Sequence, residues 1–334
     1  MQATDDSLQQ LALLQKHFLN PASAGQQRMM ELRSYTPDEY VQAIRSYPRF
    51  WASLRRSAEQ VEQYLPALQK GVEKLKAVYP DYRPADIYFT VGLFRAPGTG
   101  VDSMVLVGSE YALGTNQTDI SELPSRMQEI NYYRINPVEH LEFLVMHELI
   151  HTQQKAMSFE LLPLILYEGV AEFTAGLISG QPPAPFDFYE YGHAQEEWIK
   201  KRFSEVLFNP RMRSLWLWNS KDNEFGTYDL GYFVGSRIAQ AYYEQAEDSA
   251  AALRELLELE YQDAAAIARF TDLSGYLSAP LTELQQAYES RRPTVLAIAP
   301  FSNGSKGVDP AVKQLSITFS EPMYPGYRGF DYGP

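Results

Sequence analysis

The chain contains no cysteine among its 334 residues. This absence excludes disulfide bonds, a thiolate nucleophile and metal sites built from thiolate ligands. Any metal ion must therefore be held by histidine and carboxylate side chains. Histidine is also scarce, with only five in the chain, so two histidines at a meaningful spacing are informative.

Basic residues are in short supply as well. The chain has 29 Lys and Arg against 42 Asp and Glu, which gives a formal net charge of -13, and no basic cluster stands out. The electrostatic footprint of a nucleic-acid-binding protein is therefore missing. We expect no DNA or RNA partner.

Long apolar runs are also absent. No stretch reaches the roughly 18 uninterrupted apolar residues that a membrane-spanning helix needs. The first residues, Met1–Asp6, do not form a basic region followed by an apolar run, as an export signal would. We expect no membrane span, and either a cytoplasmic protein or one whose export signal is missing from this chain.

The composition is that of a globular enzyme-sized protein. Hydrophobic residues make up 45% of the chain, enough for one large core or for a principal domain with a smaller appendage. The 23 tyrosines far outnumber the 4 tryptophans. This aromatic content fits a groove for extended polymers, and it fits ordinary core and surface packing equally.

Helical periodicity fills the first part of the chain, from Asp6 to about Val78. Thr36-Pro37-Asp38-Glu39 is a helix start signal in this part. It is followed by two strand-like segments, Ile87–Val91 and Met104–Val107, with the turn-rich Ala96–Gly100 between them. These patterns predict a helical layer followed by a small sheet.

Further helices are predicted after the sheet, at residues 136–155, at 161–179 or 163–179, and most clearly in the remaining core at 228–246 and 249–259. Asn136 is a good N-cap and Pro137 suits the first helical position of the first of them. Gly180 ends the second. We therefore expect an α+β fold, mostly helical with a small mixed sheet.

The composition changes after Arg292. Val295–Ile298 and Leu315–Phe319 are predicted strands, and with Ser320–Met323 they resemble the first strands of bacterial Ig-like surface domains. A sandwich needs roughly 100 residues, more than remain. The chain is then either cut from a longer protein, or its tail packs on the main domain. The expected domains are residues 1–292, with a helical layer to about 80 and a metal-binding core from about 81, and a β segment at 293–334.

The segment His147-Glu148-Leu149-Ile150-His151 matches the pattern H-E-x-x-H. The i, i+4 spacing puts two imidazoles on one helix face, where both can bind a single metal ion. Glu148 then lies beside the metal, where it can take a proton from the metal-activated water and pass it to a leaving group. The alternative is a helix whose His and Glu side chains are solvated, although the preceding residues, Leu141 and Phe143–Met146, are apolar.

A catalytic zinc site usually has three protein ligands, so one is still missing. The segment Tyr167-Glu168-Gly169-Val170-Ala171-Glu172 follows at a distance that allows a turn and a returning helix. Glu168 and Glu172 are four residues apart and share a helix face. The alternative is that both belong to a solvated face.

With both motifs the chain resembles the gluzincin zinc metallopeptidases. It is similar in particular to bacterial predicted zinc-dependent proteases of an uncharacterised family and to gliding-motility-associated lipoproteins, whose second motif reads E-G-x-A. The resemblance implies a zincin-like fold and a Zn²⁺ held by His147, His151 and Glu168, with Glu172 fixing the tautomer of a ligand histidine. Gly169 would let the two motif helices approach closely.

The resemblance also has departures and wider implications. Tyr167 stands where the best-known gluzincins have Asn, the gap between the motifs is shorter, and the Gly-Ala-Met-Glu-Asn signature of aminopeptidases is absent. Aminopeptidase activity is therefore not implied. The resemblance implies a peptide or protein substrate and a periplasmic or cell-surface location, with a lipid anchor in the full-length protein, and the cytoplasm is the alternative.

An oxyanion donor is also needed opposite the metal. Related peptidases use a downstream Tyr or His, which points to Tyr232, with Tyr228 as the alternative, although either residue can be a packing aromatic. His140 lies two turns before His147, about 10 Å away, which is too far for a shared ion and favours a surface or packing role. His17 and His193 are expected to be structural.

Zincin-like folds place an edge strand beside the metal, where an extended peptide can pair with it. Gly108–Gly114 is expected to be either this edge strand or an ordinary internal strand. The sequence thus predicts a zinc-dependent hydrolase, best read as a peptidase. The alternatives are a catalytically inactive binding or assembly module at the bacterial cell surface, and a hydrolase of another amide or of a glycan-linked peptide. The presence of Glu148 favours an enzyme.

Overall fold

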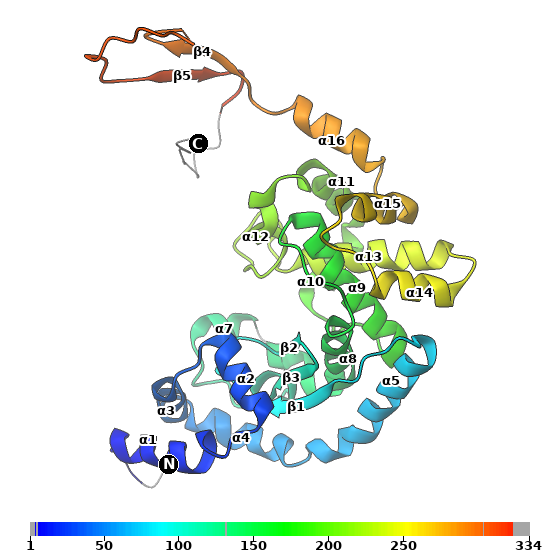
Figure 1. Cartoon of the computed structure of the whole chain (residues 1–334). Coiled ribbons are helices and arrows are strands. Elements are labelled where there is room, and N and C mark those ends of the chain that lie inside the picture. Colours follow the sequence, from blue (N-terminus) through cyan, green and yellow to red (C-terminus); the bar gives the residue numbers. More distant parts are fainter. Residues whose placement is uncertain (1–3, 5, 131, 303, 323–334) are drawn as a thin grey trace. The chain divides into compact units, whose positions relative to one another are not determined.

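Helices make up most of the protein, and two small sheets complete it (Figure 1). The computed structural model describes residues 4, 6–130, 132–302 and 304–322. Two compact units can be separated, Met1–Ala279 and Pro280–Pro334. The expected α+β class, mostly helical with a small mixed sheet and a short C-terminal β segment, is confirmed.

The first unit contains, in chain order, α1 (Ser7–Leu14), the π-helix η1 (Gln15–Leu19), α2 (Ala24–Arg33), α3 (Pro37–Ser46), α4 (Pro48–Ala58), η2 (Val61–Tyr64), α5 (Leu65–Val78), β1 (Asp86–Thr90), β2 (Gly98–Val101), β3 (Met104–Gly108), α6 (Ser109–Ala112), α7 (Ser125–Ile130), η3 (Tyr132–Ile135), η4 (Pro137–His140), α8 (Leu141–His151), α9 (Leu161–Ser179), α10 (Asp187–Ala194), α11 (Glu196–Val206), η5 (Pro210–Met212), α12 (Arg213–Trp216), α13 (Leu230–Gln245), α14 (Ser249–Leu257) and α15 (Ala264–Ser274).

The second unit contains α16 (Leu281–Ser290) and the antiparallel strands β4 (Val295–Ala299) and β5 (Ser316–Phe319). Both strands lie where the sequence predicts them. Met323, the last residue of the segment that resembles an Ig-like domain, lies outside the described residues, and that resemblance stays a prediction. The domain boundary expected after Arg292 also stays a prediction.

Side-chain caps explain why the N-terminal helices begin where they do. Thr36 and Glu39 form a capping box at the start of α3, in which Thr36 N donates to Glu39 Oε2 at 2.8 Å and Glu39 N donates to Thr36 Oγ1 at 3.4 Å. The box satisfies two backbone donors that a helix start leaves without partners. The start signal read from the sequence is therefore confirmed.

The three-stranded sheet lies between two layers of helices. Its order is β1-β3-β2, with the central β3 parallel to β1 and antiparallel to β2. Successive side chains of a strand point to opposite faces. Val105 and Val107 accordingly belong to the core that includes α8, whereas Leu106 belongs to the core that includes Met29 of α2.

Strand β2 corrects the expectation that residues 96–100 form only a turn. Glycine is depleted in strands, so the pattern Gly98-Thr99-Gly100 argues locally against one. The glycines are needed because the strand lies against α8, where a Cβ on Gly100 would come within 2.1 Å of the backbone oxygen of Glu148. β2 is an edge strand of the sheet.

Apart from Gly108, residues 108–114 belong to neither an edge strand nor an internal strand. Gly108 is the last residue of β3, and Ser109–Ala112 form the short helix α6. The edge strand beside α8 is β2, on the other side of β3 from β1. The positional expectation for this segment was therefore wrong, because the chain turns into a helix where β3 ends.

The first predicted central helix is shorter than expected. A 3₁₀ turn, η4, precedes α8, and α8 ends at His151 rather than near Lys155. Asn136 has a left-handed backbone conformation (φ 56°) and makes no side-chain cap; its Oδ1 accepts from Asn116 N instead. The helix that runs to Ser179 and ends at Gly180 is α9, as predicted from the sequence.

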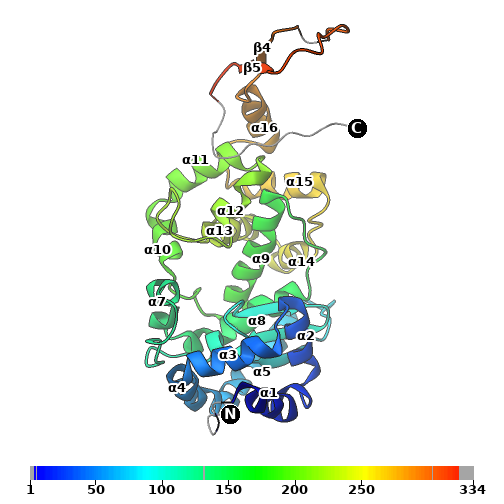
Figure 2. The ribbon, with the colours of Figure 1, turned by 90° about the vertical axis from the view of Figure 1, so that its left-hand side faces the viewer.

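Helix α9 packs against α8 on one side and α13 on another (Figure 2). By length and composition alone this helix could cross a membrane. However, 72% of its most apolar 18-residue stretch is buried inside the protein. Its close contact with α13 is made at Gly169, where a Cβ would lie 2.0 Å from the carbonyl carbon of Gly235. The two backbones can come this close only because both residues are glycine.

This contact predicts opposite effects of two Gly→Ala substitutions in α9. Gly169→Ala should lower the free energy of unfolding by at least about 1–3 kcal/mol, because backbone atoms of α13 have to move. Gly176→Ala is the matched control, since its Cβ would meet its neighbours at 3.5 Å and 3.6 Å, which are ordinary contacts. It should be neutral or stabilise by up to about 1 kcal/mol. Denaturant unfolding of both variants measures this, and equal stability would show that α9 and α13 are not in close contact.

Candidate metal centre

Helices α8 and α9 bring three ligand-type side chains together. His147 and His151 lie one turn apart on α8, and Glu168 comes from α9. Their ligand atoms lie within 4.8 Å of one another. The two Nε2 atoms are 3.0 Å apart, and Glu168 Oε2 lies 3.5 Å from that of His147 and 3.3 Å from that of His151.

These three distances suit a common metal ion. In a tetrahedral site with metal–ligand bonds near 2.0–2.1 Å, neighbouring ligand atoms lie about 3.3–3.4 Å apart. The ligand atoms of His147, His151 and Glu168 form a triangle of nearly this size, so these three residues, here called the metal group, could hold a metal ion. The structure thus brings together the three ligands expected from the sequence.

The charge around the group also favours a cation. His147, Glu148, Glu168 and Glu172 are each only 7% exposed. Three carboxylates so deeply buried are costly unless positive charge compensates them. The alternative of a solvated helix face, left open for both motifs, does not agree with this burial.

The pKa values show the same preference for positive charge. Burial alone would lower the pKa of His147, but the carboxylates of Glu168 and Glu172 outweigh it and raise that pKa well above its ordinary value. Burial would raise the pKa of Glu168, but His151 and His147 hold it at about 2. Glu168 is therefore ionised at neutral pH and can serve as an anionic ligand.

Glu172 lies behind His147. Its Oε2 is 2.8 Å from His147 Nδ1, although this nitrogen has no hydrogen bond of regular geometry. Tyr189 of α10 donates from its hydroxyl to the other oxygen of Glu172 at 2.5 Å. A carboxylate beside Nδ1 favours the tautomer in which Nε2 is free to bind a metal. The position expected for Glu172 from the resemblance agrees with this contact.

Gln154 plays the corresponding part for His151. Its Nε2 donates to Tyr167 O at 2.9 Å and to Tyr261 Oη at 2.8 Å, so its Oε1 faces His151 Nδ1 at 2.7 Å. An amide oxygen can only accept, so His151 must carry its proton on Nδ1. The Nε2 of His151 is thereby left free for a metal ion.

Sequence reasoning missed Gln154, Tyr167 and Tyr189 as supporting residues. Gln154 lies three residues after His151, a spacing that places it next to the ring. Tyr167 stacks on the His151 ring, with centroids 4.5 Å apart and an interplanar angle of 10°. This stacking gives the departure from Asn at position 167 a structural role. Nothing local in the sequence points to Tyr189.

Gly169 does not have the role that the resemblance implied. It was expected to bring the two motif helices together, but its Cα faces Gly235 and Ser236 of α13. The contact that it permits is therefore between α9 and the helix behind it. This contact still supports the site, because it fixes the helix that carries Glu168.

Glu148 lies next to the three ligands and outside their group. Its Oε2 accepts a hydrogen bond from Gly100 N of β2 at 2.7 Å. A Cβ on Gly98 would come within 2.6 Å of Glu148 Cγ, so this carboxylate packs directly against the strand. The edge strand thus holds the side chain expected to be the general base.

A cleft of about 1070 Å³ gives access to the site. The side chains of the four motif residues His147, Glu148, His151 and Glu168 all line it. Strand β2 forms part of the wall, together with aromatic residues from η3, α10 and α13. An extended ligand can therefore reach the metal group and the β2 edge at the same time.

Both candidate tyrosines line this cleft. The ring of Tyr232 lies 6.1 Å from the ring of His147, and its hydroxyl accepts from Trp218 Nε1 at 3.3 Å. Burial and the nearby Glu168 raise the pKa of Tyr232 well above its ordinary value, so its hydroxyl stays protonated. Both tyrosines pack on Phe188, with ring centroids 5.7 Å apart for Tyr228 and 6.2 Å apart for Tyr232.

Asp229 is a further residue that the sequence did not single out. It occupies the N-cap position of α13 with a left-handed backbone (φ 54°). Its Oδ1 accepts from Trp218 N at 2.5 Å and Asn219 N at 3.4 Å, and burial raises its pKa to about 6. Asp229 therefore shapes the loop that presents Trp218 to the cleft.

The remaining histidines take no part in the metal group. His140 lines the same cleft from η4, and burial lowers its pKa. His17 and His193 are exposed and lie outside the cleft lining, and His193 contacts the ring of Phe233. The structural or packing roles expected for these three histidines stay predictions.

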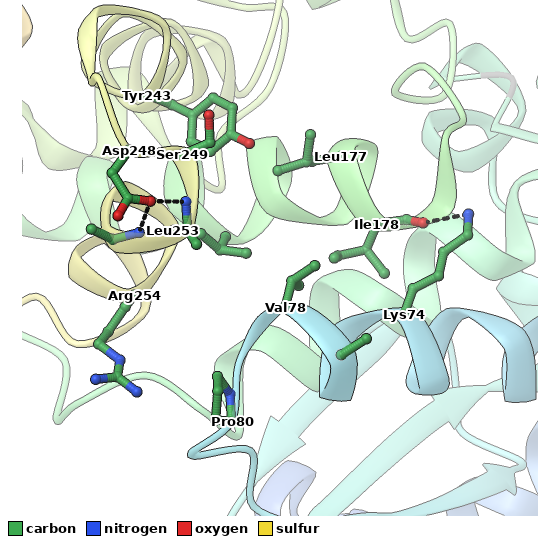
Figure 3. A pocket seen from close by; sticks show the side chains of 13 residues that line it. Lys74, Val78, Pro80, Leu177, Ile178, Tyr243, Asp248, Ser249, Leu253 and Arg254 are labelled. Carbon is green, nitrogen blue, oxygen red and sulfur yellow. Dashed lines mark hydrogen bonds between the residues drawn. The ribbon is translucent and has the colours of Figure 1, made fainter.

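A second cavity, of about 840 Å³, lies among α5, the end of α9 and the start of α14 (Figure 3). Lys74 Nζ donates to Ile178 O, and the Asp248 carboxylate accepts from Ala250 N and Ala251 N, which caps α14. Of the polar groups that Figure 3 shows bonded, Lys74 thus joins α5 to α9 and Asp248 stabilises the start of α14. None of the metal-group residues lines this cavity.

Comparison with models of protein families, with curated proteins and with solved structures found no match. What the site can do must therefore be inferred from its own residues and geometry.

The environment of His147 predicts that Glu172→Gln weakens metal binding. Loss of the carboxylate charge beside Nδ1 should lower the affinity by about 10–100-fold. Competition with a chelator of known affinity measures this change. Glu190→Gln, which alters an exposed carboxylate next to Tyr189, is the control and should bind metal like the unmodified protein. Equal affinity of the two variants would show that Glu172 does not support the site.

Metal binding should also depend on pH. A raised pKa keeps His147 protonated at neutral pH when no metal is bound, and a metal ion must displace that proton. The affinity should therefore rise with pH between about pH 5 and 8, with about one proton released per ion. Titration calorimetry in buffers of different ionisation enthalpy counts the protons. Binding without proton release would contradict the raised pKa.

Proposed function

We propose that this protein is a zinc-dependent hydrolase that cleaves peptide bonds. The observation that carries the proposal is the buried group of His147, His151 and Glu168, with the carboxylate of Glu148 beside it in the same cleft. Two ligands and a neighbouring acid come from a single helical turn, and the third ligand comes from the helix packed against it.

The donor set supports zinc as the metal. Two imidazoles and one carboxylate in a near-tetrahedral arrangement are typical of catalytic zinc sites, whereas Mg²⁺ and Ca²⁺ prefer oxygen ligands. Gln154 and Glu172 orient the imidazoles for this binding, as partners of ligand histidines usually do. Bound Zn²⁺ would supply Lewis acidity, which lowers the pKa of water and polarises a carbonyl oxygen.

Glu148 would be the proton carrier. The hydrogen bond from Gly100 N engages Oε2 and leaves Oε1 able to accept a proton. A general base takes the proton from the attacking water and then returns it to the leaving nitrogen. The backbone contact fixes the carboxylate in one orientation, so this transfer needs no search for the right rotamer.

Tyr232 would be the donor to the developing oxyanion. Its hydroxyl oxygen accepts from Trp218 Nε1, so its own hydrogen is free to point to another acceptor. A protonated hydroxyl in a buried wall is the kind of donor that stabilises a tetrahedral intermediate. Tyr228 lines the same cleft and is the alternative donor.

The outer edge of β2 supports an extended peptide as the substrate, which would pair with the edge groups of Gly98 and Gly100 other than the Gly100 N–H bonded to Glu148. Gly100 N donates to Glu148 and not to β3, so the backbone groups of Gly98 and Gly100 face away from β3. Such an edge can pair with an extended chain by main-chain hydrogen bonds. The strand lines the cleft beside Glu148, which would bring a paired peptide close to the metal group.

The test compares the unmodified protein with Glu148→Gln on a mixture of peptides, with zinc measured by elemental analysis in both. Both proteins should contain about one zinc per chain, and the variant should cleave at least about 10²–10⁴-fold more slowly. Glu142→Gln, a carboxylate on the same helix outside the cleft lining, is the matched control and should retain activity. A protein without zinc, or equal activity of Glu148→Gln, would overturn the proposal.

A further inference from the structure

Arg33 is the last residue of α2 and lines the cleft from the far side of the edge strand. Its Nη2 donates to Thr99 Oγ1 of β2 at 2.6 Å. Thr99 pairs with Leu106, whose side chain lies in the core that includes α2. Arg33 therefore sits on the α2 face of β2, opposite the face on which α8 carries Glu148.

The charge of Arg33 is not neutralised by the protein. In the part of the chain that the structure describes, its guanidinium forms no ion pair, and its Nε is buried without a hydrogen-bond partner. The neighbouring Arg95 donates to Arg33 O and pairs with the carboxylate of Glu39. A half-buried cation without a counter-ion is energetically costly. Carboxylates are abundant in this chain, whose net charge is -13, and yet none of those described pairs with Arg33.

The geometry of β2 relates this cation to the metal group. Gly98 and Gly100 pair with Val107 and Val105 and face α8, whereas Thr99 faces α2. Side chains of an added strand alternate between the same two faces. If one residue of a paired peptide points its side chain to the α8 face, which carries the metal ligands, the residues before and after it point theirs to the α2 face, where Arg33 lies.

We propose that Arg33 is a specificity residue that binds a carboxylate of the substrate. The preferred substrates are acidic extended peptides, with the carboxylate one strand position from the residue that faces the metal. A planar guanidinium with free donors matches a carboxylate better than an ammonium group does. The carboxylate comes from an Asp or Glu side chain or from the end of the peptide. This inference rests on the proposed function.

The test is a set of labelled synthetic peptides bound to the whole 334-residue chain, loaded with zinc and carrying Glu148→Gln, with fluorescence polarisation as the readout. At each position the peptides carry Asp, Glu, Asn, Gln or Lys, and each is made with a free and an amidated C-terminus. Peptides with Asp or Glu should bind about tenfold more tightly than the matching peptides with Asn or Gln, as expected for one charge-assisted contact. If the carboxylate is that of the peptide end, amidation of the C-terminus should weaken binding. If it is a side-chain carboxylate, the preference for Asp or Glu should persist in the amidated peptides.

Adding Arg33→Glu should reverse the preference, so that Lys-containing peptides bind more tightly than acidic ones. This gain of binding cannot come from a misfolded variant. Arg33→Lys should retain a weaker acidic preference, because it keeps the charge and loses the planar fork. Arg28→Glu is the matched control, since Arg28 lies on the same helix, pairs with Asp102 and does not line the cleft.

Failure of this inference is distinguishable from failure of the proposed function. No acidic preference, no peptide binding, or a preference that Arg33→Glu leaves unchanged would overturn the role of Arg33. If zinc-dependent cleavage is found alongside any of these results, the hydrolase stands. Acid-selective binding that depends on Arg33, found in a protein without zinc or cleavage, would keep the Arg33 site and overturn the hydrolase.

Discussion

The contact of one buried carboxylate with two imidazoles governs the arrangement of this protein. Glu168 can lie between His147 and His151 only if α9 is held firmly against α8, and such a buried charge is tolerated only where opposite charge meets it. The apolar length of α9 and the Gly169–Gly235 contact with α13 supply the first condition. The imidazoles, and the cation that they could bind together with Glu168, supply the second. A helix that appears suited to a membrane by composition is thus the support of a polar site.

Strand β2 is constrained by the same helix. Its two glycines face α8 at distances that no side chain could occupy, and one of them donates its N–H to Glu148. The strand is weak by propensity and is stabilised by its neighbours, which is common for elements next to functional sites. The acid beside the metal group and the strand edge that faces the cleft are thereby fixed relative to each other. A change in the path of β2 would move both.

Local patterns predicted the parts of this structure that local forces determine. The capping box at Thr36, the end of α9 at Gly180 and the shared face of His147 and His151 depend on residues a few positions apart, and all are as expected. Strand β2 and the partner of Gly169 could not be read from the sequence, because tertiary packing overrides the usual meaning of glycine there. Asn136 was misread as a cap because Asn also tolerates a left-handed backbone. Tyr189 and Tyr261 reach the site from distant segments, so no spacing rule finds them.

The two faces of β2 carry opposite charge, and this separation has a physical reason. Carboxylates crowd the α8 face because a metal ion and two imidazoles can balance them, whereas a cation placed among them would compete for the same oxygens. Arg33 and Arg95 lie on the α2 face, where the sheet separates them from that group. Successive side chains of a strand paired with β2 would point to opposite faces of the sheet, so they would meet the acidic and the basic environment in turn. In the proposed complex the sheet would therefore do more than cover α8, because it would set which charge meets each successive residue of the bound peptide.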